Sequence, residues 1–436
     1  MTTVGVINHG CPKNLVDTEV MLGFLDEAGY KTTLDIEKSD IVLVNTCAFI
    51  ADAQQESIAT IVELIDNEKP VIVAGCLPQK FKKELMKELP EIFAFLGPAD
   101  LAKVADVVRD FEEKQIKTIY HVTEEPSIIY PENVNRVQIT VGSSSYIKIA
   151  EGCNYKCAYC VIPQLRGRYH SRSIDNIYKE AVELAKKGVS EVILIAQDTS
   201  YYGFDKFGAP ILASLLEKLN TIEELDWIRV MYTYPSMIND ELISAIKNCD
   251  KVVKYLDIPL QHSHPDVLKR MNRPAMDYRE LITKLRKEIP EIALRTSLIV
   301  GFPGETQEEF DDLYEFVKEA RFDRLGVFEF SREEGAPAYS MKPQISAKIK
   351  KERKKKIMEL QSRISKEINE SFIGKKIPVL IESIVSNGEI VARSYRDAPE
   401  IDGLVYIETD KIVSPGDVEM ATVIAATEYD LVARID

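Results

Sequence analysis

The chain has 436 residues, of which 45% are apolar, and a formal net charge of −15. This length predicts two or three domains, each with enough apolar content to bury a core. The acidic charge argues against a general nucleic-acid binder and allows a basic partner, and seven cysteines are too few for a disulfide scaffold.

Sparse cysteines indicate a reducing compartment, in which clustered thiols are expected to be metal ligands or catalysts. The chain opens on "MTTVGVINHG", which has the pattern of a short strand, and no apolar run is long enough to span a bilayer. We expect a cytoplasmic monomer with no membrane contact.

The first predicted domain covers residues 1–115. Helical runs such as "NLVDTEVMLGFLDEAG" alternate there with the strand-like runs "VGVINHG", "DIVLVNTCAF", "PVIVAGC" and "FAFLG". This alternation is typical of a doubly wound parallel α/β sheet. A linker is expected over residues 116–140, where "TEEPSIIYPENVN" is rich in charge and proline.

A second alternating series covers residues 141–345. Its six strands read "YIKIA", "EVILIAQD", "WIRVMYTY", "YLDIPLQ", "ALRTSLIVGF" and "RLGVFEFS". A closed barrel of this type has eight β/α units, so six units predict an open, partial (β/α)6 barrel.

Two further segments complete the chain. Residues 346–372 form a predicted connecting helix, because Ile357, Leu360, Ile364 and Ile368 share one helical face. Residues 373–436 read as short strands with turns at "SNGE" and "SPGD", which predicts a small antiparallel β-barrel. The expected fold class is a multidomain α/β protein with a C-terminal β-barrel.

Three cysteines that are far apart in the sequence share one position relative to the predicted strands. Cys11, Cys47 and Cys76 each stand at or just beyond a strand's C-terminal end, in "INHGC", "LVNTC" and "IVAGC". Ligands of open α/β sheets bind at those ends, so the three thiols are expected to converge. The alternative is a buried, inert thiol, which we favour for Cys249 at a predicted helix end.

A second group of cysteines is close in the sequence: "GCNYKCAYC" places Cys153, Cys157 and Cys160 at the spacing C-x3-C-x2-C. Structural zinc sites usually show two ligand pairs, and here no second pair follows; the nearest imidazole is His170, in the charged stretch "RGRYHSRS". Ferredoxin clusters use another spacing and a fourth cysteine. We favour a three-thiolate iron-sulfur cluster with one open iron, beside which Tyr159 can contact a flat base.

Other residues of the second series are candidate cofactor contacts. In "LRTSLIVGFPGET", strand alternation puts Arg295, Ser297 and Gly301 on one face. Arg295 would need an anion, either a cofactor carboxylate or a structural partner such as Asp257. Gly301 would let a ring approach the backbone, and Gln197 would contact the amino acid end of the cofactor.

The motif "CNYKCAYC", after a strand and at the mouth of a six-unit β/α series, resembles the radical S-adenosylmethionine (SAM) superfamily. The resemblance implies a [4Fe-4S] cluster on Cys153, Cys157 and Cys160, with the amino and carboxylate groups of SAM on the fourth iron. It also implies cleavage to a 5′-deoxyadenosyl radical by an electron from a donor such as flavodoxin or ferredoxin. Such chemistry suits a C–H bond that has no acidity for a side-chain base.

The whole chain is similar to the methylthiotransferases, which combine a three-cysteine α/β domain, a radical SAM barrel and a C-terminal TRAM domain. The matching stretches are "HGCPKNLVDTE", "VNTCAFI" and "AGCLPQ". By this resemblance Cys11, Cys47 and Cys76 hold a second [4Fe-4S] cluster with one open iron. That cluster would carry the sulfur to be inserted, which a separate sulfur source must supply.

Two branches of this family differ in substrate. One modifies an adenosine of transfer RNA, and the RimO branch modifies an aspartate of the twelfth small-subunit ribosomal protein. "GCPKNLVDTE" and "RSYRDAPEIDG", Arg393 to Gly403, resemble the RimO branch. Charge supplies a separate argument, because Gly374 to Asp436 holds six Lys and Arg against twelve Asp and Glu, a net of −6. Such a domain should repel RNA and bind a basic ribosomal protein.

The implied reaction adds a methylthio group to the β-carbon of that aspartate. The radical would take a hydrogen from this carbon, the second cluster would deliver sulfur, and another SAM would give the methyl group. We expect the TRAM domain to hold the substrate over the barrel mouth. The alternatives are a tRNA adenosine methylthiotransferase and, from another class, a non-catalytic iron-sulfur or zinc-binding protein.

One feature favours contact with RNA. "KIKKERKKK", Lys348 to Lys356, holds seven basic residues and one acid. It could touch ribosomal RNA, but we favour the solvated start of the connecting helix, because charge runs usually have that role.

Overall fold

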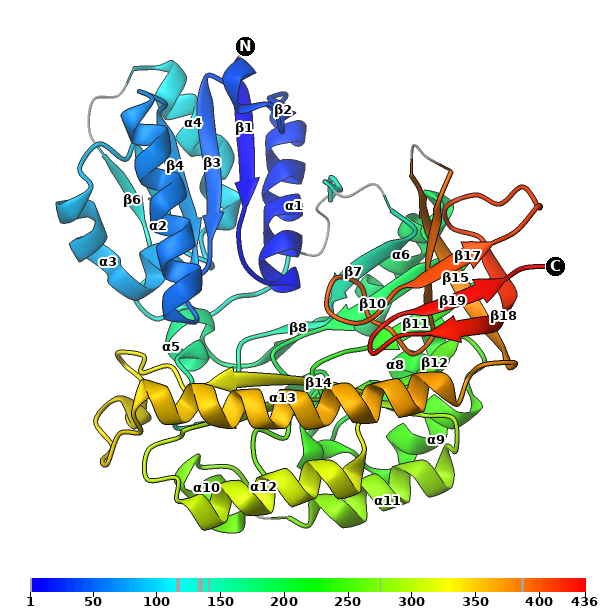
Figure 1. Ribbon diagram of the computed structural model, residues 1–436. Helices are drawn as coiled ribbons and strands as arrows, with labels where there is room; N and C mark the ends of the chain where they lie inside the picture. The colour runs from blue at the N-terminus through cyan, green and yellow to red at the C-terminus, as the bar shows by residue number, and fades with distance from the viewer. Residues whose placement is uncertain (1, 115–117, 132–135, 140–141, 275, 386–387) are drawn as a thin grey trace. The chain divides into compact units, whose positions relative to one another are not determined.

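The computed structural model (Figure 1) describes residues 2–114, 118–131, 136–139, 142–274, 276–385 and 388–436. The contacts between residues divide the chain into two compact units. The N-terminal unit comprises Met1–Val141, Ala150–Arg172 and Ser331–Tyr339. The barrel unit comprises Gly142–Ile149, Ser173–Phe330 and Ser340–Asp436. The predicted segment 141–345 therefore contributes to both units, and part of the predicted linker 116–140 lies outside the described residues.

The N-terminal unit is built on a parallel sheet in the order β2-β1-β3-β4-β5-β6. Its strands are β1 (Thr3–Asn8), β2 (Lys31–Thr33), β3 (Ile41–Thr46), β4 (Val71–Gly75), β5 (Ala94–Leu96) and β6 (Ile119–His121). This order confirms the predicted doubly wound sheet. The sequence missed β2 and β6, which have three residues each and lie at the sheet edges, where no buried alternation marks them.

Helices cover both faces of this sheet: α1 (Pro12–Glu27), α2 (Ala51–Asp66), α3 (Cys76–Glu88) and α4 (Val104–Glu112). One apolar core forms with α1 and α4, and another with α2 and α3. Leu43 of β3 belongs to the first core, while Val42 and Val44 belong to the second. Because both faces are buried, β3 reads as a continuous apolar run.

Two later segments of the chain belong to the N-terminal unit. Ala150–Arg172 holds the antiparallel pair β8 (Ala150–Glu151) and β9 (His170–Ser171), and helix α5 (Ile162–Arg166). Val161 and Leu165 from this segment, and Ala336 from Ser331–Tyr339, join the core of α2 and α3. The C-x3-C-x2-C loop is therefore in the same unit as the three dispersed cysteines.

In the barrel unit, six parallel strands form an open sheet in the order β14-β13-β12-β11-β10-β7. They are β7 (Ser144–Lys148), β10 (Glu191–Ile195), β11 (Trp227–Val230), β12 (Val252–Asp257), β13 (Ala293–Val300) and β14 (Arg324–Glu329). The helices between them are α6 (Ile174–Lys186), α7 (Phe204–Phe207), α8 (Leu212–Leu219), α9 (Asp240–Asn248), α10 (Pro265–Arg270), α11 (Tyr278–Glu288) and α12 (Gln307–Ala320). All six strands match the predicted runs, which confirms the partial barrel.

The connecting helix is α13 (Ala347–Glu370), which buries Ile357, Leu360 and Ile364 as predicted. A closed barrel follows in the order β15-β16-β17-β19-β18. Its strands are β15 (Lys376–Ile384), β16 (Ile390–Ser394), β17 (Val405–Glu408), β18 (Val418–Ala426) and β19 (Leu431–Arg434). The pair β17–β19 is parallel, so the predicted antiparallel barrel needs one correction.

Short 3-10 helices lie at Ile36–Lys38, Leu101–Lys103, Pro235–Met237 and Pro337–Tyr339. Across the described residues, every helix is either too short or too polar to cross a membrane.

Candidate functional site

Cys11, Cys47 and Cys76, here called the dispersed cysteines, follow three neighbouring strands of the N-terminal sheet. Cys11 stands between β1 and α1, Cys47 follows β3, and Cys76 begins α3 directly after β4. In the parallel register Asn8 of β1 is opposite Asn45 of β3. The three thiols therefore lie at the C-terminal edge of the sheet, and the first two flank its topological switch point.

The cysteine-bearing loops approach one another closely. Gly10 adopts φ +96°, and a Cβ atom added there would lie 2.7 Å from Cys47 Cβ and 3.2 Å from Cys47 Sγ. Negative charge on Cys11 or Cys47 would raise the pKa of Cys76, which shows that the three thiols interact. The expected convergence is present, and it requires glycine at position 10.

A buried hydrogen-bond network fixes these loops. Asn14 Nδ2 donates to the carbonyl oxygens of His9 and Thr46 at 3.0 Å each, which ties the first cysteine loop to the end of β3. Asn45 Nδ2 donates to the Asn14 carbonyl oxygen at 2.8 Å. Thr46 Oγ1 donates to the Ala74 carbonyl oxygen at 2.6 Å, near the end of β4, the strand that precedes Cys76. These hydrogen bonds thus hold the thiol-bearing backbone in place.

The dispersed cysteines are poorly suited to act as bare nucleophiles. Burial raises the pKa of Cys76 to about 11, and it also raises the pKa of Cys47. The positive charge of Arg166 acts in the opposite direction on both thiols. Because a coordinating metal removes the thiol proton outright, these residues are better suited to be metal ligands.

Cys153, Cys157 and Cys160, here called the loop cysteines, lie on one short segment of the same unit. The Cys160 N–H donates to the Cys157 carbonyl oxygen at 3.1 Å. The Ile162 N–H donates to Cys160 Sγ at 3.4 Å, a contact that stabilises negative charge on sulfur. Tyr159, the predicted contact for a flat base, is half-buried on this loop.

Neither group has the spacing of a single-ion site. None of the seven cysteines forms a disulfide. No three thiols in the described part of the chain lie within 4.8 Å of one another, as ligands of one ion would. The thiolates of a cubane bind different irons and are spaced more widely. His170, the alternative zinc ligand, places Nε2 3.1 Å from Ser127 Oγ. The dispersed and the loop cysteines remain the predicted ligands of two three-thiolate clusters.

Arg166 contacts residues close in sequence to both cysteine groups. From the sequence alone it belonged to a predicted charged loop. It ends α5, and its side chain is 3% exposed. Its Nη1 donates to Asp17 Oδ2 at 2.5 Å and to Glu151 Oε2 at 3.3 Å. Its Nη2 donates to Asn14 Oδ1 at 2.6 Å. The stretch "RGRYHSRS" holds several cations, and only the fold shows that Arg166 and Arg172 are buried while Arg168 is exposed.

The segment Ser331–Tyr339 supplies a second residue that sequence reasoning missed, Glu333. Its carboxylate accepts from the Ala51 N–H at 3.0 Å, from Gln54 Nε2 at 2.9 Å and from Lys80 Nζ at 2.7 Å. Ala51 begins α2, which has no side-chain cap from its own sequence. Glu333 therefore caps this helix from a distant part of the chain, where no local sequence signal could reveal it.

The predicted cofactor contacts of the barrel unit follow the expected alternation. Arg295 and Ser297 share a half-buried face of β13, and Gln197 is half-buried after β10. Gly301 follows β13 with φ +71°, and a Cβ atom there would lie 2.4 Å from Cγ of Lys350. The side chain that approaches this glycine is Lys350 of α13, where sequence reasoning expected a cofactor ring.

Protein carboxylates surround the Arg295 guanidinium. Nη1 donates to Asp257 Oδ1 at 2.9 Å, and Nε donates to Asp402 Oδ1 at 3.3 Å. The Tyr255 hydroxyl also donates to Asp402, at 2.7 Å. Two carboxylates already satisfy this cation, so the prediction that Arg295 binds a cofactor carboxylate is corrected to the structural alternative.

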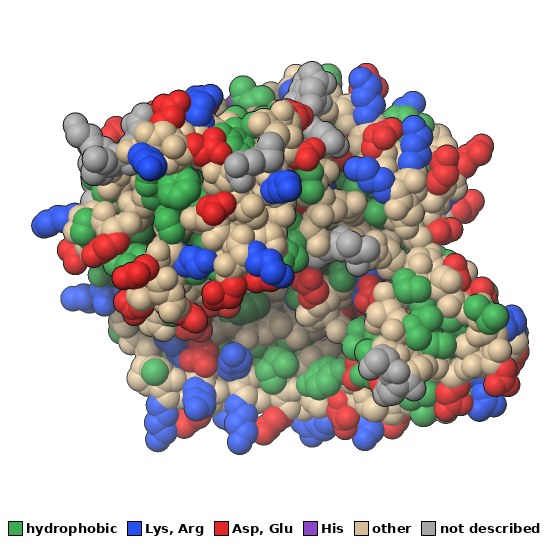
Figure 2. Space-filling view, turned by 90° about the horizontal axis from the view of Figure 1, so that it is seen from above, with side chains coloured by type: hydrophobic (Ala, Val, Ile, Leu, Met, Phe, Trp, Pro, Cys, Tyr) green, Lys and Arg blue, Asp and Glu red, His purple; other side chains and the backbone are tan. Residues whose placement is uncertain are grey.

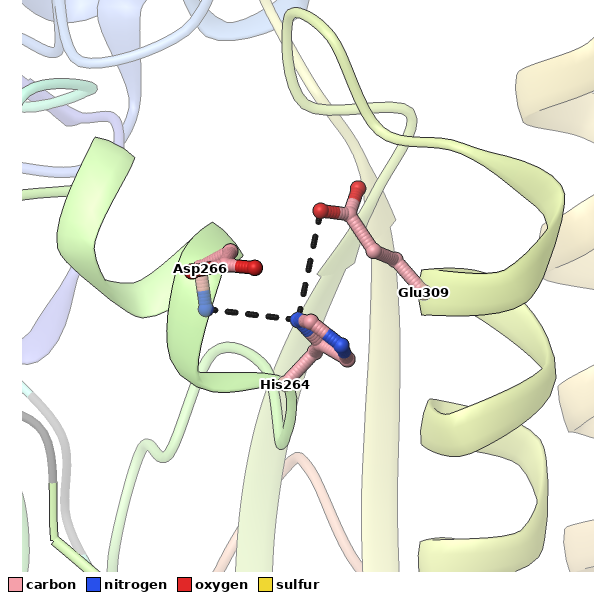
Figure 3. A group of neighbouring side chains, drawn as sticks. All are labelled: His264, Asp266 and Glu309. Carbon is pink, nitrogen blue, oxygen red and sulfur yellow. Dashed lines mark hydrogen bonds and ion pairs between the residues drawn. The ribbon is translucent and has the colours of Figure 1, made fainter.

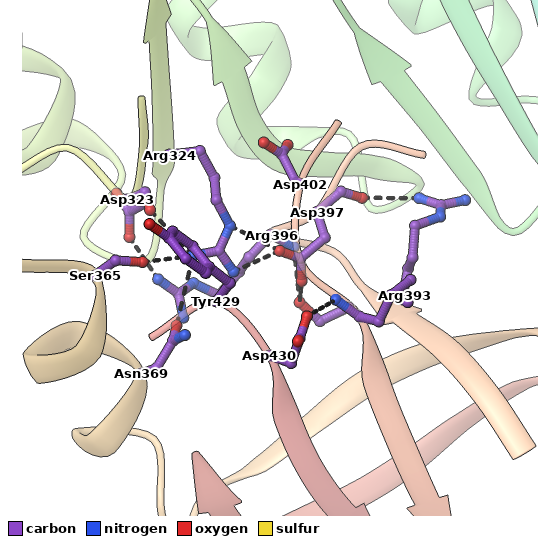
Figure 4. A network of polar contacts seen from close by, with 12 residues as sticks. Asp323, Arg324, Ser365, Asn369, Arg393, Arg396, Asp397, Asp402, Tyr429 and Asp430 are labelled. Carbon is purple, nitrogen blue, oxygen red and sulfur yellow. Dashed lines mark hydrogen bonds and ion pairs between the residues drawn. The ribbon is translucent and has the colours of Figure 1, made fainter. Parts of the chain in front are cut away.

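The stretch "RSYRDAPEIDG" belongs to the C-terminal barrel. It contacts the N-terminal ends of strands in the open six-stranded sheet (Figure 4). Arg393 Nη2 donates to Glu191 Oε2, on the first residue of β10, at 2.6 Å. Two further buried pairs are Arg324–Asp397 and Arg396–Asp323. Active sites of β/α barrels lie at the opposite, C-terminal strand ends. The expectation that this domain covers the barrel mouth is therefore corrected.

His264, Asp266 and Glu309 form the one group in the described chain whose ligand atoms lie within 4.8 Å of one another (Figure 3). His264 Nδ1 accepts the Asp266 N–H at 3.2 Å and caps α10. Glu309 accepts from Arg270 at 2.9 and 2.7 Å and completes a capping box with Thr306. These groups already have structural roles as helix caps, so the trio is better explained without a metal.

The basic run at the start of α13 is partly structural. Arg353 is buried and its Nη1 donates to Glu305 Oε1 at 2.6 Å, while Lys350 Nζ donates to the Phe330 carbonyl oxygen at 2.6 Å. The exposed members are Lys348, Lys351, Lys354, Lys355 and Lys356. On the face shown in Figure 2, the coloured acidic and basic side chains are interspersed and form no continuous basic groove.

Three family models match separate parts of the chain. The Radical SAM superfamily matches residues 147–317, the Uncharacterized protein family UPF0004 matches residues 3–97, and the TRAM domain matches residues 373–435. The ribosomal protein uS12 methylthiotransferase RimO of Caldanaerobacter subterraneus subsp. tengcongensis is 50% identical over 441 residues, covering 100% of both chains. The chain belongs to the RimO family.

This membership agrees with the branch predicted from "GCPKNLVDTE". The RimO protein of Geotalea uraniireducens is 48% identical and covers 99% of this chain and 98% of its own. Among solved structures, the radical SAM methyltransferase TsrM from Kitasatospora setae, with cobalamin and a [4Fe-4S] cluster bound, has a TM-score of 0.56 at 15% identity. It covers 86% of this chain and 79% of its own, and this likeness supports a shared fold.

Proposed function

We propose that this member of the RimO family attaches a methylthio group to the β-carbon of an aspartate in ribosomal protein uS12. The observation that carries the proposal is the presence of two three-thiol groups, the dispersed and the loop cysteines, in one compact unit. Forming a radical from SAM requires only the loop cysteines. The dispersed cysteines must therefore have a second task, and holding the sulfur to be inserted is the task that this reaction needs.

Two [4Fe-4S] clusters and SAM are the cofactors of this activity. The loop cysteines would hold the cluster that binds SAM, and the dispersed cysteines would hold the cluster that carries sulfur. When bound, these groups supply the electron, the radical, the inserted sulfur and the methyl group.

The chain's own groups shape both centres. Helix α1 begins directly after Cys11, and α3 begins at Cys76, so positively polarised helix ends face negative charge on these sulfurs. The Ile162 N–H does the same for Cys160. Our proposed SAM contacts are Tyr159, Gln197 and Ser297.

We infer that the acidic C-terminal barrel attracts the basic substrate. Its joint with the barrel strands buries Arg393, Arg396, Asp397 and Asp402. Removing two of six cations leaves four, and removing two of twelve acids leaves ten, so the net charge stays −6. Ribosomal proteins are basic, and long-range attraction of this kind raises the rate of encounter.

We further propose an electron donor of the flavodoxin or ferredoxin type and a separate sulfur source, because no group of the described chain supplies either. The proposed substrate is made in the cytoplasm, which is the proposed location of the enzyme. We propose that it acts as a monomer.

An anaerobic assay that offers uS12 and transfer RNA side by side tests the proposal. The reconstituted enzyme receives SAM, a reductant and sulfide, and mass spectrometry follows both substrates. We expect one methylthio group on the aspartate-bearing peptide of uS12 and unmodified nucleosides. Modification of adenosine instead would assign the transfer RNA branch. About eight irons per chain without SAM cleavage would favour an iron-sulfur carrier.

A further inference from the structure

Arg166 bridges two sequence motifs that carry cysteines. Asn14 and Asp17, which bind its two terminal nitrogens, lie in the first turns of α1 after Cys11. Glu151, which binds Nη1, stands just before the first loop cysteine. A single guanidinium thus connects the helix of one cysteine group to the strand that leads into the other.

The contact with Asn14 has structural consequences beyond one hydrogen bond. Asn14 uses Nδ2 to hold the carbonyl oxygens of His9 and Thr46, and its Oδ1 accepts from Arg166. Arg166 therefore fixes the orientation of the amide that ties the first and second cysteine loops together. The rigid, planar fork of arginine suits this task, and the point charge of lysine does not reproduce it.

The charge of Arg166 is also placed where a cluster would need it. The guanidinium is buried at 3% exposure, and its positive charge acts to lower the pKa of both Cys76 and Cys47, against the effect of burial. Three deprotonated sulfur ligands bring negative charge into a space with little water, and buried charge requires a partner. Asp17 and Glu151 hold the guanidinium in position from the other side.

We propose that Arg166 is a positioning residue of the sulfur-carrying centre: it braces the first turn of α1 behind Cys11 and supplies a buried positive charge beside Cys76. This inference rests on the proposed function, because it requires that the dispersed cysteines hold a cluster. A nearby cation favours the reduced, more negative state of a cluster. Loss of Arg166 is therefore expected to make this cluster harder to reduce or to prevent its retention.

The test isolates one cluster in the full-length chain. A parent carrying Cys153→Ala, Cys157→Ala and Cys160→Ala retains only the dispersed cysteines. Arg166→Gln removes the charge, and Arg166→Lys keeps the charge without the fork. Arg136→Gln is the matched control, because Arg136 is also buried and pairs with Glu19 of α1 at 2.5 Å. Iron content, an EPR-monitored redox titration and the melting temperature are measured for each.

We expect about four irons per chain in the parent and in Arg136→Gln. Arg166→Gln should show a more negative midpoint potential that Arg166→Lys partly restores, or a loss of iron that the control does not share. Unchanged iron and potential in Arg166→Gln would overturn the inference, as would equal changes in the Arg136 control. Iron missing already from the parent would overturn the ligand assignment itself, and this result appears before Arg166 is altered.

Discussion

Cys47 and Cys76 are buried, whereas Cys153 and Cys160 on the loop are partly exposed. Burial raises the pKa of the first two thiols, which makes them inert until a metal replaces their protons. Cys11 is also partly exposed and Cys157 is buried, so each group contains both buried and partly exposed thiols. The partial exposure of Cys153 and Cys160 suits a centre that must admit a small molecule to its open iron.

Alanine substitutions should separate the two tasks. Replacing the loop cysteines should abolish formation of 5′-deoxyadenosine, because the electron no longer reaches SAM. Replacing the dispersed cysteines should leave 5′-deoxyadenosine formation intact and stop thiolation of uS12. Chromatography of the nucleoside product and mass spectrometry of the peptide measure both. Thiolation that persists without the dispersed cysteines would refute the division of labour.

His262 illustrates the cost of burying a titratable group. Its side chain is inaccessible to solvent, its Nδ1 accepts the His264 N–H at 3.0 Å, and burial lowers its pKa to about 3. In the unfolded chain His262 has an ordinary histidine pKa near 6.5 and binds a proton below that pH. In the folded chain it stays neutral until the pH approaches its lowered pKa. Stability is therefore lost as pH falls below about 6.5 and continues to fall towards the folded pKa.

Urea unfolding at pH 7 and pH 5.5 measures this effect through the fluorescence of Trp227, the single tryptophan of the chain. The wild-type free energy of unfolding should fall by about 1 kcal/mol more than that of His262→Asn over this interval. Equal pH dependence in the two proteins would contradict the assignment.

At the scale of elements, α13 shows how one charge run divides between two roles. Arg353 donates a hydrogen bond to Glu305, and Lys350 donates one to the Phe330 carbonyl oxygen. The five exposed lysines face solvent, as the favoured interpretation of the run predicted. A lysine side chain packed against the backbone just after a strand can also require glycine there, and Gly301 after β13 leaves this space for Lys350.

Replacing the exposed Lys348, Lys351, Lys354 and Lys355 with glutamine tests the remaining RNA hypothesis. We expect little change in modification of either free uS12 or intact small subunits, because solvated lysines contribute little to the fold. The control replaces Lys179, Lys186, Lys187 and Lys206, which are exposed in the same unit. A selective loss on intact subunits, absent from the control, would show that α13 contacts ribosomal RNA.

At the scale of the whole barrel unit, buried ion pairs attach the C-terminal barrel to the strand ends. Glu191 accepts from both Arg229 and Arg393, and these three side chains are fully buried. Removing one arginine from such a group breaks a buried, hydrogen-bonded ion pair, which is strongly destabilising. The C-terminal barrel is therefore a fixed part of this unit and not a tethered module.

Arg393→Ala should destabilise the barrel unit by about 3–5 kcal/mol, because it leaves Glu191 with one cation instead of two. Trp227 lies in β11 beside this joint and reports the transition during urea unfolding. Arg434→Ala is the control, since its pair with Glu408 is solvent-exposed and should contribute nothing measurable. Equal unfolding curves for the two variants would contradict the role of the joint.

Much of this protein could be predicted from its sequence because the relevant signals are local. Strand and helix periodicity identified the doubly wound sheet, the six barrel strands and the C-terminal barrel. The dispersed cysteines could be grouped because the ends of parallel strands meet at one edge of a sheet. The spacing of the loop cysteines identified the second group on its own. Short edge strands such as β2 could not be predicted from periodicity, because they bury no alternating face.

Tertiary structure decided the rest, because the deciding partners are distant in sequence. Arg166, Glu333 and the acidic partners of Arg295 meet their contacts across gaps that no periodicity spans. The same reason explains why "RSYRDAPEIDG", a family signature in the sequence, is a buried joint at the strand N-termini. The sequence alone thus determined which residues can carry the chemistry. The fold determined which charges are buried beside them, since a charge reveals its role only when its partner is known.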